Sequence, residues 1–301
     1  MNGELAISTN QHLVTIAENI TAAINSHIQF KHIEPIGGGC INQVSKVTDS
    51  QGNRWLIKEN SPHLLDMFIA EAQGLQEISK SKSIRVPSVI CYGKTTETSY
   101  LVIEYISLSA SAGNTKTAEK LAKMHRYKAT KFGWFRDNTI GVTPQYNQQT
   151  DSWVQFWQQQ RLLPQLQLAL KNAYPKAAYE DGLKLVEKIE VFFSNYRPIP
   201  SLLHGDLWSG NHAHDQDGKP VIFDPAVYYG DRETDIAMTE LFGGFSPAFY
   251  SRYNDCFPLD DGYSVRKTLY NLYHTLNHYN LFGGGYASQA TNMTRRLLSE
   301  T

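Results

Sequence analysis

The sequence has no long hydrophobic run, no excess of basic residues and no basic N-terminal stretch. Its apolar runs are much shorter than the roughly 18 residues of a membrane-spanning helix, so we expect no membrane partner. With 28 Lys and Arg against 29 Asp and Glu, the net charge is −1, and no basic stripe predicts a nucleic-acid partner. Residues 1–30 include acidic residues and lack the positive start of a secretory signal.

Cysteines are also few, and their arrangement is uninformative about metals. Cys40, Cys91 and Cys256 are an odd number and lack the spacing of a metal site, which favours a reducing cytoplasm. The remaining composition, 41% hydrophobic and 19% charged residues, is ordinary for a globular enzyme. A chain of 301 residues is long enough for two lobes with a sizeable core.

The most informative stretch is Leu-Leu-His-Gly-Asp-Leu-Trp-Ser-Gly-Asn at residues 202–211. It reads as a short apolar strand followed by a tight polar loop, in which Asp206 and Asn211 fit the spacing His-x-Asp-x4-Asn. A second apolar run follows a turn and ends in Asp224. The pattern therefore places two acids and an amide just beyond the ends of two neighbouring strands.

Phosphoryl transfer needs this combination of groups. One carboxylate accepts the proton of the attacking hydroxyl, while an amide oxygen and a second carboxylate hold the metal ions at the phosphates. The kinase pattern is His-Arg-Asp-x4-Asn followed by Asp-Phe-Gly. Here Gly205 replaces the Arg, and Asp-Pro-Ala at residues 224–226 stands in place of Asp-Phe-Gly. The motif alone also fits a polar turn between strands, so other parts of a kinase are needed to support it.

The first hundred residues predict a nucleotide-binding flap. An amphipathic helix at 10–29 precedes short strands at 31–36, 41–48 and 55–58. The first two strands are separated by Gly37, Gly38 and Gly39, and glycine lets backbone N–H groups approach phosphate oxygens closely. A tight hairpin would explain the three glycines equally well.

A lysine and a glutamate in this region predict an internal ion pair. Ser61-Pro62 is typical of a helix start, and the helix that follows carries Glu71 on the stripe of its apolar residues. A carboxylate on a core-facing stripe is costly without a cation, and Lys58 ends the preceding strand. In kinases such a pair directs the lysine to the nucleotide phosphates. The alternative is that Glu71 points to water.

The composition changes at residues 107–114, which are rich in Ser, Ala and Gly. Strands are expected at 87–93 and 100–106 before this segment. Helices are expected after it, at about 115–128, 151–171 (bent or broken at Pro164), 176–195, 232–242, 262–281 and 286–299. We predict an α+β, bilobal, protein-kinase-like fold, with a β-rich nucleotide-binding lobe at 1–106 and a mainly helical catalytic and substrate lobe at 107–301. By position alone, the backbone of Glu104, Tyr105 and Ile106 forms the adenine hinge.

Longer stretches resemble the fructosamine (ketosamine) 3-kinase family. The resemblance extends over nearly the whole chain from about Ile33. The sequence Leu-Trp-Ser-Gly-Asn at residues 207–211 is more typical of this family than of aminoglycoside or choline kinases. The matching segments are 161–166, 204–211, 223–226, 229–230, 235–245, 276–278 and 281–286.

The resemblance implies ATP- and magnesium-dependent phosphorylation of the sugar 3-hydroxyl in a small or protein-bound ketosamine. The 3-phosphate is prone to leave the amine, so the family is credited with deglycation repair. By position, the resemblance makes Asp206 the proton acceptor and makes Asn211 and Asp224 metal ligands. It also implies that Lys58 contacts phosphate, oriented by Glu71, and that an acid at a helix start, Asp235, braces the catalytic loop.

Several further residues are candidates for substrate contact. Trp208 either stacks on a sugar ring or packs beneath the catalytic loop. Tyr229 belongs to a matching motif, and Asp231 stands where family members often have His, which could alter the preference among ketosamines. His278 lies on a helix whose polar face is expected to line the substrate cleft.

Two pairs of histidines and one cysteine leave alternatives open. His212 and His214 share a strand face, and His274 and His278 are one helical turn apart, spacings that suit either metal binding or hydrogen-bonded core histidines. Some ketosamine kinases form an intermolecular disulfide at the position of Cys40, so the protein is expected to be a monomer or a redox-sensitive dimer.

The residues leave two other functions open. A nucleotide-binding protein that no longer transfers phosphate would also keep some of the five polar residues expected of a kinase, Lys58, Glu71, Asp206, Asn211 and Asp224. An aminoglycoside, choline or other amino-alcohol kinase would need extra acids for its cationic substrates, and Asp231, Glu233, Asp260 and Asp261 could supply them.

Overall fold

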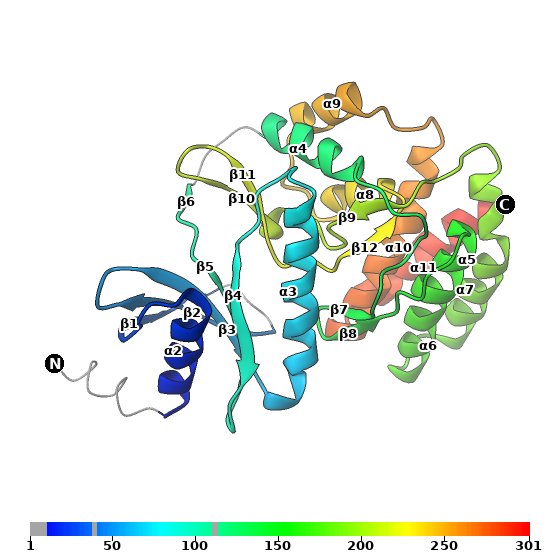
Figure 1. Ribbon diagram of the computed structural model, residues 1–301. Helices are drawn as coiled ribbons and strands as arrows, with labels where there is room; N and C mark the ends of the chain where they lie inside the picture. Colours follow the sequence, from blue (N-terminus) through cyan, green and yellow to red (C-terminus); the bar gives the residue numbers. More distant parts are fainter. Residues whose placement is uncertain (1–10, 38–40, 110–113) are drawn as a thin grey trace.

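The computed structural model describes residues 11–37, 41–109 and 114–301, and these form a β-rich N-terminal part and a mainly helical C-terminal part (Figure 1). The predicted α+β, two-lobed architecture is confirmed. Among the described residues, no helix is both long enough and apolar enough to cross a membrane.

The N-terminal sheet has five antiparallel strands in the order β1-β2-β3-β5-β4. Successive residues of a strand face opposite sides of a sheet, so β3 buries Trp55 and Ile57 on one side and directs Leu56 and Lys58 to the other. Helix α2 covers the first side and α3 lies on the second. The bounds are α2 (Gln11–Ile24), β1 (Phe30–Pro35), β2 (Gln43–Asp49), β3 (Arg54–Asn60), α3 (Leu65–Lys80), β4 (Val89–Lys94) and β5 (Ser99–Glu104).

The predicted strands and helices of this part agree with the structure to within a few residues, except at the start of α3. Ser61 and Pro62 begin a short 3₁₀ turn, Pro62–Leu64, before the α-helix starts at Leu65. The helix α2 ends at Ile24, several residues before the predicted end at 29.

The C-terminal part packs helices around one continuous core that also includes α3. Its helices are α4 (Thr115–His125), α5 (Trp153–Phe156), α6 (Leu163–Lys171), α7 (Lys176–Lys188), α8 (Glu233–Leu241), α9 (Pro247–Cys256), α10 (Tyr263–Phe282) and α11 (Tyr286–Ser299). Six helical regions were predicted, and α9 was not. The irregularity expected at Pro164 is present as a π-helix, Trp157–Leu162, directly before it, consistent with the missing N–H of proline.

Short strands position the catalytic loop. β9 (Ser201–Leu203) pairs with β12 (Tyr228–Gly230), and β10 (His212–Asp215) pairs with both β11 (Pro220–Ile222) and β6 (Leu108–Ser109). The remaining pair is β7 (Asn138–Ile140) with β8 (Thr143–Gln145). β6 follows β5 after three residues and pairs with β10, so the chain runs from the N-terminal sheet directly into the sheet of the C-terminal part.

Candidate active site

The catalytic loop is held from beneath by a buried carboxylate. Asp235, in the first turn of α8, accepts hydrogen bonds from the backbone N–H groups of His204 at 2.7 Å and Gly205 at 2.9 Å. His125 lies 3.1 Å from the same carboxylate, and the ring of His204 contacts the carbonyl of Phe223 at 3.0 Å. Asp235, the acid implied by the family resemblance, therefore does brace the loop, and the ring of His204 links the loop to the segment that ends in Asp224.

Gly205, which stands where kinases have Arg, is required by two features of the backbone. Its φ is +84°, and a Cβ atom at this position would lie 2.1 Å from the carbonyl oxygen of Ala226. Ala226 in turn donates its N–H to the carbonyl of His204 at 2.8 Å. The two strand ends approach so closely that no side chain fits between them.

Asp206, Asn211 and Asp224 line one large cavity of about 990 Å³. Residues from both lobes form its walls. The amide nitrogen of Asn211 donates to the backbone carbonyl of Asp206 at 2.9 Å, and lies 3.3 Å from its carboxylate. Burial, followed by the nearby charges of Asp224 and Asp235, raises the pKa of Asp206 to about 7. This carboxylate therefore titrates near neutral pH, in the range suited to accepting a proton.

The predicted ion pair is present. The buried ammonium of Lys58 lies 2.5 Å from the carboxylate of Glu71 and also donates to Asp224. Burial alone would lower the pKa of Lys58, but the charges of Asp224 and Glu71 outweigh it and raise that pKa above its ordinary value of 10.5. The lysine therefore stays charged and connects β3, α3 and the end of β11 in one contact.

The donor set near Asp224 fits a hard divalent cation. Asn211 uses its nitrogen as a donor, which leaves its amide oxygen free of hydrogen bonds among the described residues. The carboxylate of Asp224 is 48% exposed, and its backbone has a φ of +58°, a left-handed conformation that Asp tolerates better than most residues. Carboxylate and amide oxygens are the ligands that Mg²⁺ prefers, with substrate phosphates and water completing its coordination.

The predicted adenine hinge lies at the same cavity. Glu104, Tyr105 and Ile106 line it, together with apolar residues of the sheet and of the β10–β11 hairpin region. The side chain of Glu104 is bonded elsewhere, to Arg85 at 2.6 Å and to the N–H of Ser88. Its backbone N–H is also used, donating to the carbonyl of Ser88 at 2.8 Å. Gly37 also lines the cavity, whereas Gly38, Gly39 and Cys40 lie outside the described residues.

Part of the cavity lining is an aromatic wall, defined here as Trp208, Phe242, His278, Phe282 and Tyr286. The ring of Phe242 lies 4.7 Å from that of His278 and 6.5 Å from that of Trp208, measured between centroids. The ring of Trp208 packs over Gly210 in the catalytic loop, and Trp208 is still 39% exposed. Trp208 and His278 therefore remain candidates for substrate contact.

Tyr229 and Asp231 are not part of this cavity, so we correct our expectation that they contact substrate. The hydroxyl of Tyr229 donates to Glu77 on α3 at 2.7 Å. Asp231 is fully buried and accepts hydrogen bonds from the hydroxyls of Tyr196 and Tyr270. Both side chains are therefore engaged in hydrogen bonds within the protein.

The histidine pairs have mixed surroundings. Thr117 lies 2.8 Å from the ring of His212 and 3.4 Å from that of His214, and the ring of His278 contacts the carbonyl of His274. Both ring nitrogens of the buried His274 are without a hydrogen-bond partner in the structure, and burial lowers its pKa to about 3. Neither pair has the third ligand that a zinc site would require among the described His, Cys, Asp and Glu residues.

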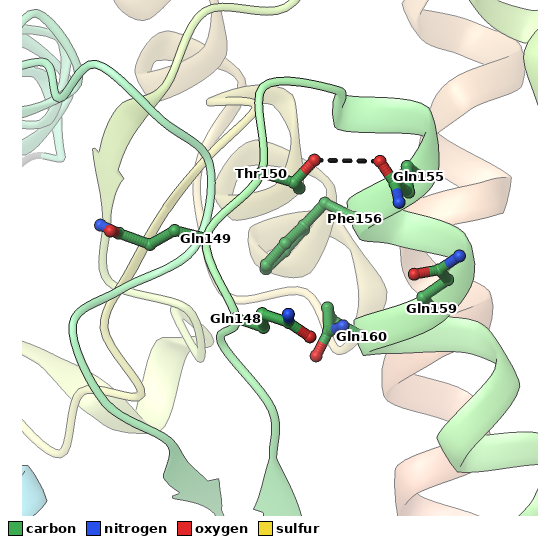
Figure 2. Close-up of a pocket in the computed structure, with 7 residues that line it drawn as sticks. All are labelled: Gln148, Gln149, Thr150, Gln155, Phe156, Gln159 and Gln160. Atoms are coloured by element: carbon green, nitrogen blue, oxygen red, sulfur yellow. Dashed lines mark hydrogen bonds between the residues drawn. The ribbon is translucent and has the colours of Figure 1, made fainter.

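A second, smaller pocket of about 130 Å³ lies beside the π-helix (Figure 2). Its rim consists of amide and hydroxyl side chains, and Thr150 donates to Gln155 at 3.1 Å over the buried ring of Phe156. Since it contains no titratable group, it has none of the chemistry of the large cavity.

Comparison with known proteins agrees with this geometry. The family model for fructosamine kinase matches residues 12–300. The chain belongs to the fructosamine kinase family. It is 44% identical over 287 residues to "Probable ketoamine kinase" of Synechocystis sp., covering 94% of this chain and 96% of that protein. It is 42% identical over 269 residues to "Protein-ribulosamine 3-kinase, chloroplastic" of Arabidopsis thaliana, covering 88% and 82%.

A solved structure shows that the fold is shared as well. The crystal structure of "Putative fructosamine-3-kinase" from Haemophilus somnus superimposes with a TM-score of 0.87 at 31% identity, covering 94% of this chain and 96% of that one. The predicted kinase-like fold and an alcohol-directed phosphotransferase activity are confirmed by these relationships.

Sequence reasoning missed three members of the aromatic wall, Phe242, Phe282 and Tyr286. Phe242 and Phe282 fall within stretches that resemble the family, but nothing in their spacing shows that the ends of α8, α10 and α11 meet at one cavity. Their exposure, 39% for Phe242 and 55% for Phe282, could be recognised only in the folded chain.

The close approach at Gly205 predicts a large loss of stability for Gly205→Ala. We expect a loss of about 3 kcal/mol or more, because the added Cβ meets Ala226 and the backbone conformation is strained. Gly218→Ala is the matched control, since Gly218 has φ +71° with no atom within 4 Å of the added Cβ, and should cost about 1 kcal/mol. Urea denaturation measures both; equal losses would show that the contact with Ala226 is unimportant.

The raised pKa of Asp206 predicts a pH-dependent stability difference. An acid whose pKa is higher in the folded chain than its ordinary 3.8 binds its proton more tightly when folded, so ionisation destabilises the fold. Asp206→Asn should therefore gain stability relative to wild type as pH rises from about 4 to about 7, by at most roughly 1.4 kcal/mol per pH unit, and level off above.

This comparison is made by urea denaturation from pH 5 to 8 with a chelator present. Asp217→Asn, at an exposed carboxylate in the β10–β11 turn, is the control and should show no such trend. A pH-independent difference for Asp206→Asn would contradict the raised pKa.

Proposed function

We propose that this protein transfers the γ-phosphoryl group of ATP to the 3-hydroxyl of ketosamines, such as fructosamine and ribulosamine adducts of amines or proteins, and so initiates their removal. The observation that carries the proposal is the convergence of Asp206, Asn211, Asp224 and the Lys58–Glu71 pair on one cavity. The names of the related proteins, ketoamine kinase and ribulosamine 3-kinase, support the same substrate class.

In the proposed reaction, the protein positions two reactants and balances charge. Asp206 accepts the proton of the sugar hydroxyl, which approaches between this carboxylate and the γ-phosphate. Lys58, oriented by Glu71, contacts the α- and β-phosphates, and the backbone at 104–106 holds the adenine. Asn211 and Asp224 would hold magnesium, which neutralises the triphosphate when bound. Most of the rate is expected from positioning and charge stabilisation, because phosphoryl transfer requires little help from a base.

The structure does not favour the aminoglycoside alternative. That alternative relied on Asp231, Glu233, Asp260 and Asp261 to hold a polycation. Asp231 and Glu233 are buried, and the carboxylate of Glu233 is occupied by Arg266 at 2.8 Å. Asp260 is bonded to the same guanidinium at 2.6 Å, and none of the four lines the large cavity.

The same cavity argues for an active enzyme over a nucleotide-binding protein without transferase activity. All five polar groups expected of a kinase are present, and the proton acceptor faces the proposed nucleotide site with a pKa near neutrality. Three expectations stay predictions: the lobe boundary at 106/107, the cytoplasmic location, and the monomer or redox-sensitive dimer.

The substrate class is tested by incubating the protein with ATP, Mg²⁺ and a panel of ketosamines, polyols and aminoglycosides. We expect phosphate transfer to ketosamines alone, and ¹H–³¹P NMR should place the phosphate on the 3-oxygen. Transfer to an aminoglycoside or to choline at a higher kcat/KM than to any ketosamine would overturn the proposal.

The role of Asp206 predicts a separation of binding from turnover. Asp206→Asn should bind ATP with nearly unchanged affinity, yet lose roughly two to four powers of ten in kcat, the range of a general base and its associated positioning. Calorimetry gives the affinity and a coupled assay gives kcat, with Asp217→Asn as the control. Near-normal turnover in Asp206→Asn would remove Asp206 from the role of proton acceptor.

A further inference from the structure

The helix that carries Glu71 has a second face with its own contacts. Asp66, Gln73 and Glu77 are spaced by seven and four residues, so they lie on one side of α3, displaced around the helix from Glu71. We call these three residues the polar stripe of α3. An acidic and amide stripe on an amphipathic helix would ordinarily face water, as the sequence suggests for Glu77.

In the folded protein all three residues contact the C-terminal lobe: Gln73 and Glu77 are partly buried against it, whereas the side chain of Asp66 is still 81% exposed. Arg136, in the loop before β7, donates to Asp66 at 2.6 Å and to Gln73 at 2.9 Å. Tyr229, in β12, donates its hydroxyl to Glu77 at 2.7 Å. These contacts are spread along α3 from its first turn to its last, and Figure 1 shows the helix standing between the N-terminal sheet and the strands β7, β8 and β12.

The middle of the helix is fixed by close packing on the segment that begins at Asp224. A Cβ atom at Gly74 would lie 3.2 Å from the side chain of Val227 and 3.6 Å from that of Pro225. Along α3, Glu71 therefore meets Asp224 through Lys58, Gly74 meets Pro225 and Val227, and Glu77 meets Tyr229.

The two donors are themselves held by one loop. The backbone of Tyr229 exchanges hydrogen bonds with that of Gly133 at 2.8 and 2.9 Å, and Gly133 lies three residues before Arg136. A rotation of α3 about its axis would carry the polar stripe away from both donors and would turn Glu71 away from Lys58. The contacts with the stripe and the ion pair therefore depend on the same helix orientation.

We propose that Tyr229 and Arg136 are positioning residues for phosphoryl transfer: by holding the polar stripe of α3 against the C-terminal lobe, they keep Glu71 directed at Lys58. Tyr229, expected from the sequence to contact substrate, acts instead on the nucleotide side of the reaction. This inference rests on the proposed role of the Lys58–Glu71 pair, but not on the identity of the phosphate acceptor.

The first test is a double-mutant cycle between Tyr229→Phe and Glu71→Gln. Tyr229→Phe removes one hydroxyl, and we expect it to lower kcat/KM for ATP by roughly three- to tenfold, the range for the loss of one ordinary hydrogen bond. If Tyr229 acts through Glu71, the same substitution in the Glu71→Gln background should change kcat/KM by less than about twofold, because the pair is already impaired. An equal loss in both backgrounds would overturn the proposal.

Variants of the partner provide a second and independent test. Glu77→Gln keeps an oxygen that accepts the phenol hydrogen bond and should retain most of the activity, whereas Glu77→Ala should reproduce the loss seen in Tyr229→Phe. Tyr92→Phe, at an exposed tyrosine of β4, is the matched control and should leave kcat/KM for ATP unchanged. Full activity in Glu77→Ala would also overturn the proposal.

The cycle is repeated with the dissociation constant of Mg·ATP, measured by calorimetry without any acceptor. Coupling between Tyr229 and Glu71 in this constant supports the positioning role even if ketosamines prove not to be the substrate. If the wild-type protein does not phosphorylate ketosamines but Tyr229 and Glu71 are coupled in Mg·ATP binding, only the proposed function is contradicted. If the wild-type protein does phosphorylate ketosamines but the effects of Tyr229→Phe and Glu71→Gln on Mg·ATP binding are additive, only the positioning role is contradicted.

Discussion

The buried ammonium of Lys58 is the contact on which the arrangement of this molecule depends. A buried charge costs several kcal/mol unless it is paired, and here two carboxylates from different parts of the chain meet it. Glu71 comes from a helix and Asp224 from the end of a hairpin strand, so the pairing requires the sheet, α3 and the C-terminal lobe to assemble together. In the proposed complex, nucleotide phosphate would take over part of the role that Asp224 has in the free protein.

A second buried charge, the carboxylate of Asp235, holds the catalytic loop in place, as the ammonium of Lys58 holds the two lobes together. Its two carboxylate oxygens accept the N–H groups of consecutive residues, His204 and Gly205, which would otherwise be buried without partners. The loop can then approach the Ala226 backbone so closely that only glycine fits. Asp206 is presented from this rigid support into a cavity where burial and neighbouring acids keep its proton affinity high. The close packing that supports the catalytic loop thus also raises the pKa of Asp206.

Much of this could be predicted from the sequence, because the relevant patterns are local. The spacing of Asp206 and Asn211, and the unusual acid on the apolar stripe of α3, each indicate a structure without knowledge of the rest of the chain. Lys58 could be paired with Glu71 because burying a carboxylate alone is costly, a constraint that holds in any fold. The strand order up to residue 106 was also visible, and the residues chosen by position as the hinge, 104–106, line the large cavity; their contact with adenine stays a prediction.

The parts that were missed depend on contacts between distant elements. Tyr229 and Asp231 follow the catalytic segment in sequence, yet β12 turns their side chains toward α3 and toward a buried cluster around Arg266. Helix α9 has no strong apolar stripe, with only Phe249 and Tyr253 fully buried, so its periodicity was weak. The aromatic wall is assembled from the catalytic loop and the ends of three helices, and no sequence spacing links those places.

The charges of the large cavity give a physical reason for metal ions in the proposed reaction. Among the described residues that line it, four are acids: Glu71, Glu104, Asp206 and Asp224. Glu104 is paired with Arg85, which leaves the other three acids facing the ammonium of Lys58. A triphosphate entering this cavity would add several negative charges to a site that is already acidic, and the repulsion would be strong away from bulk water. In the proposed complex, divalent cations held by Asn211 and Asp224 would reverse that balance, and they would allow Asp206 to lose its proton at a lower pH than in their absence. Nucleotide affinity and the readiness of the proton acceptor would then both depend on the same cations.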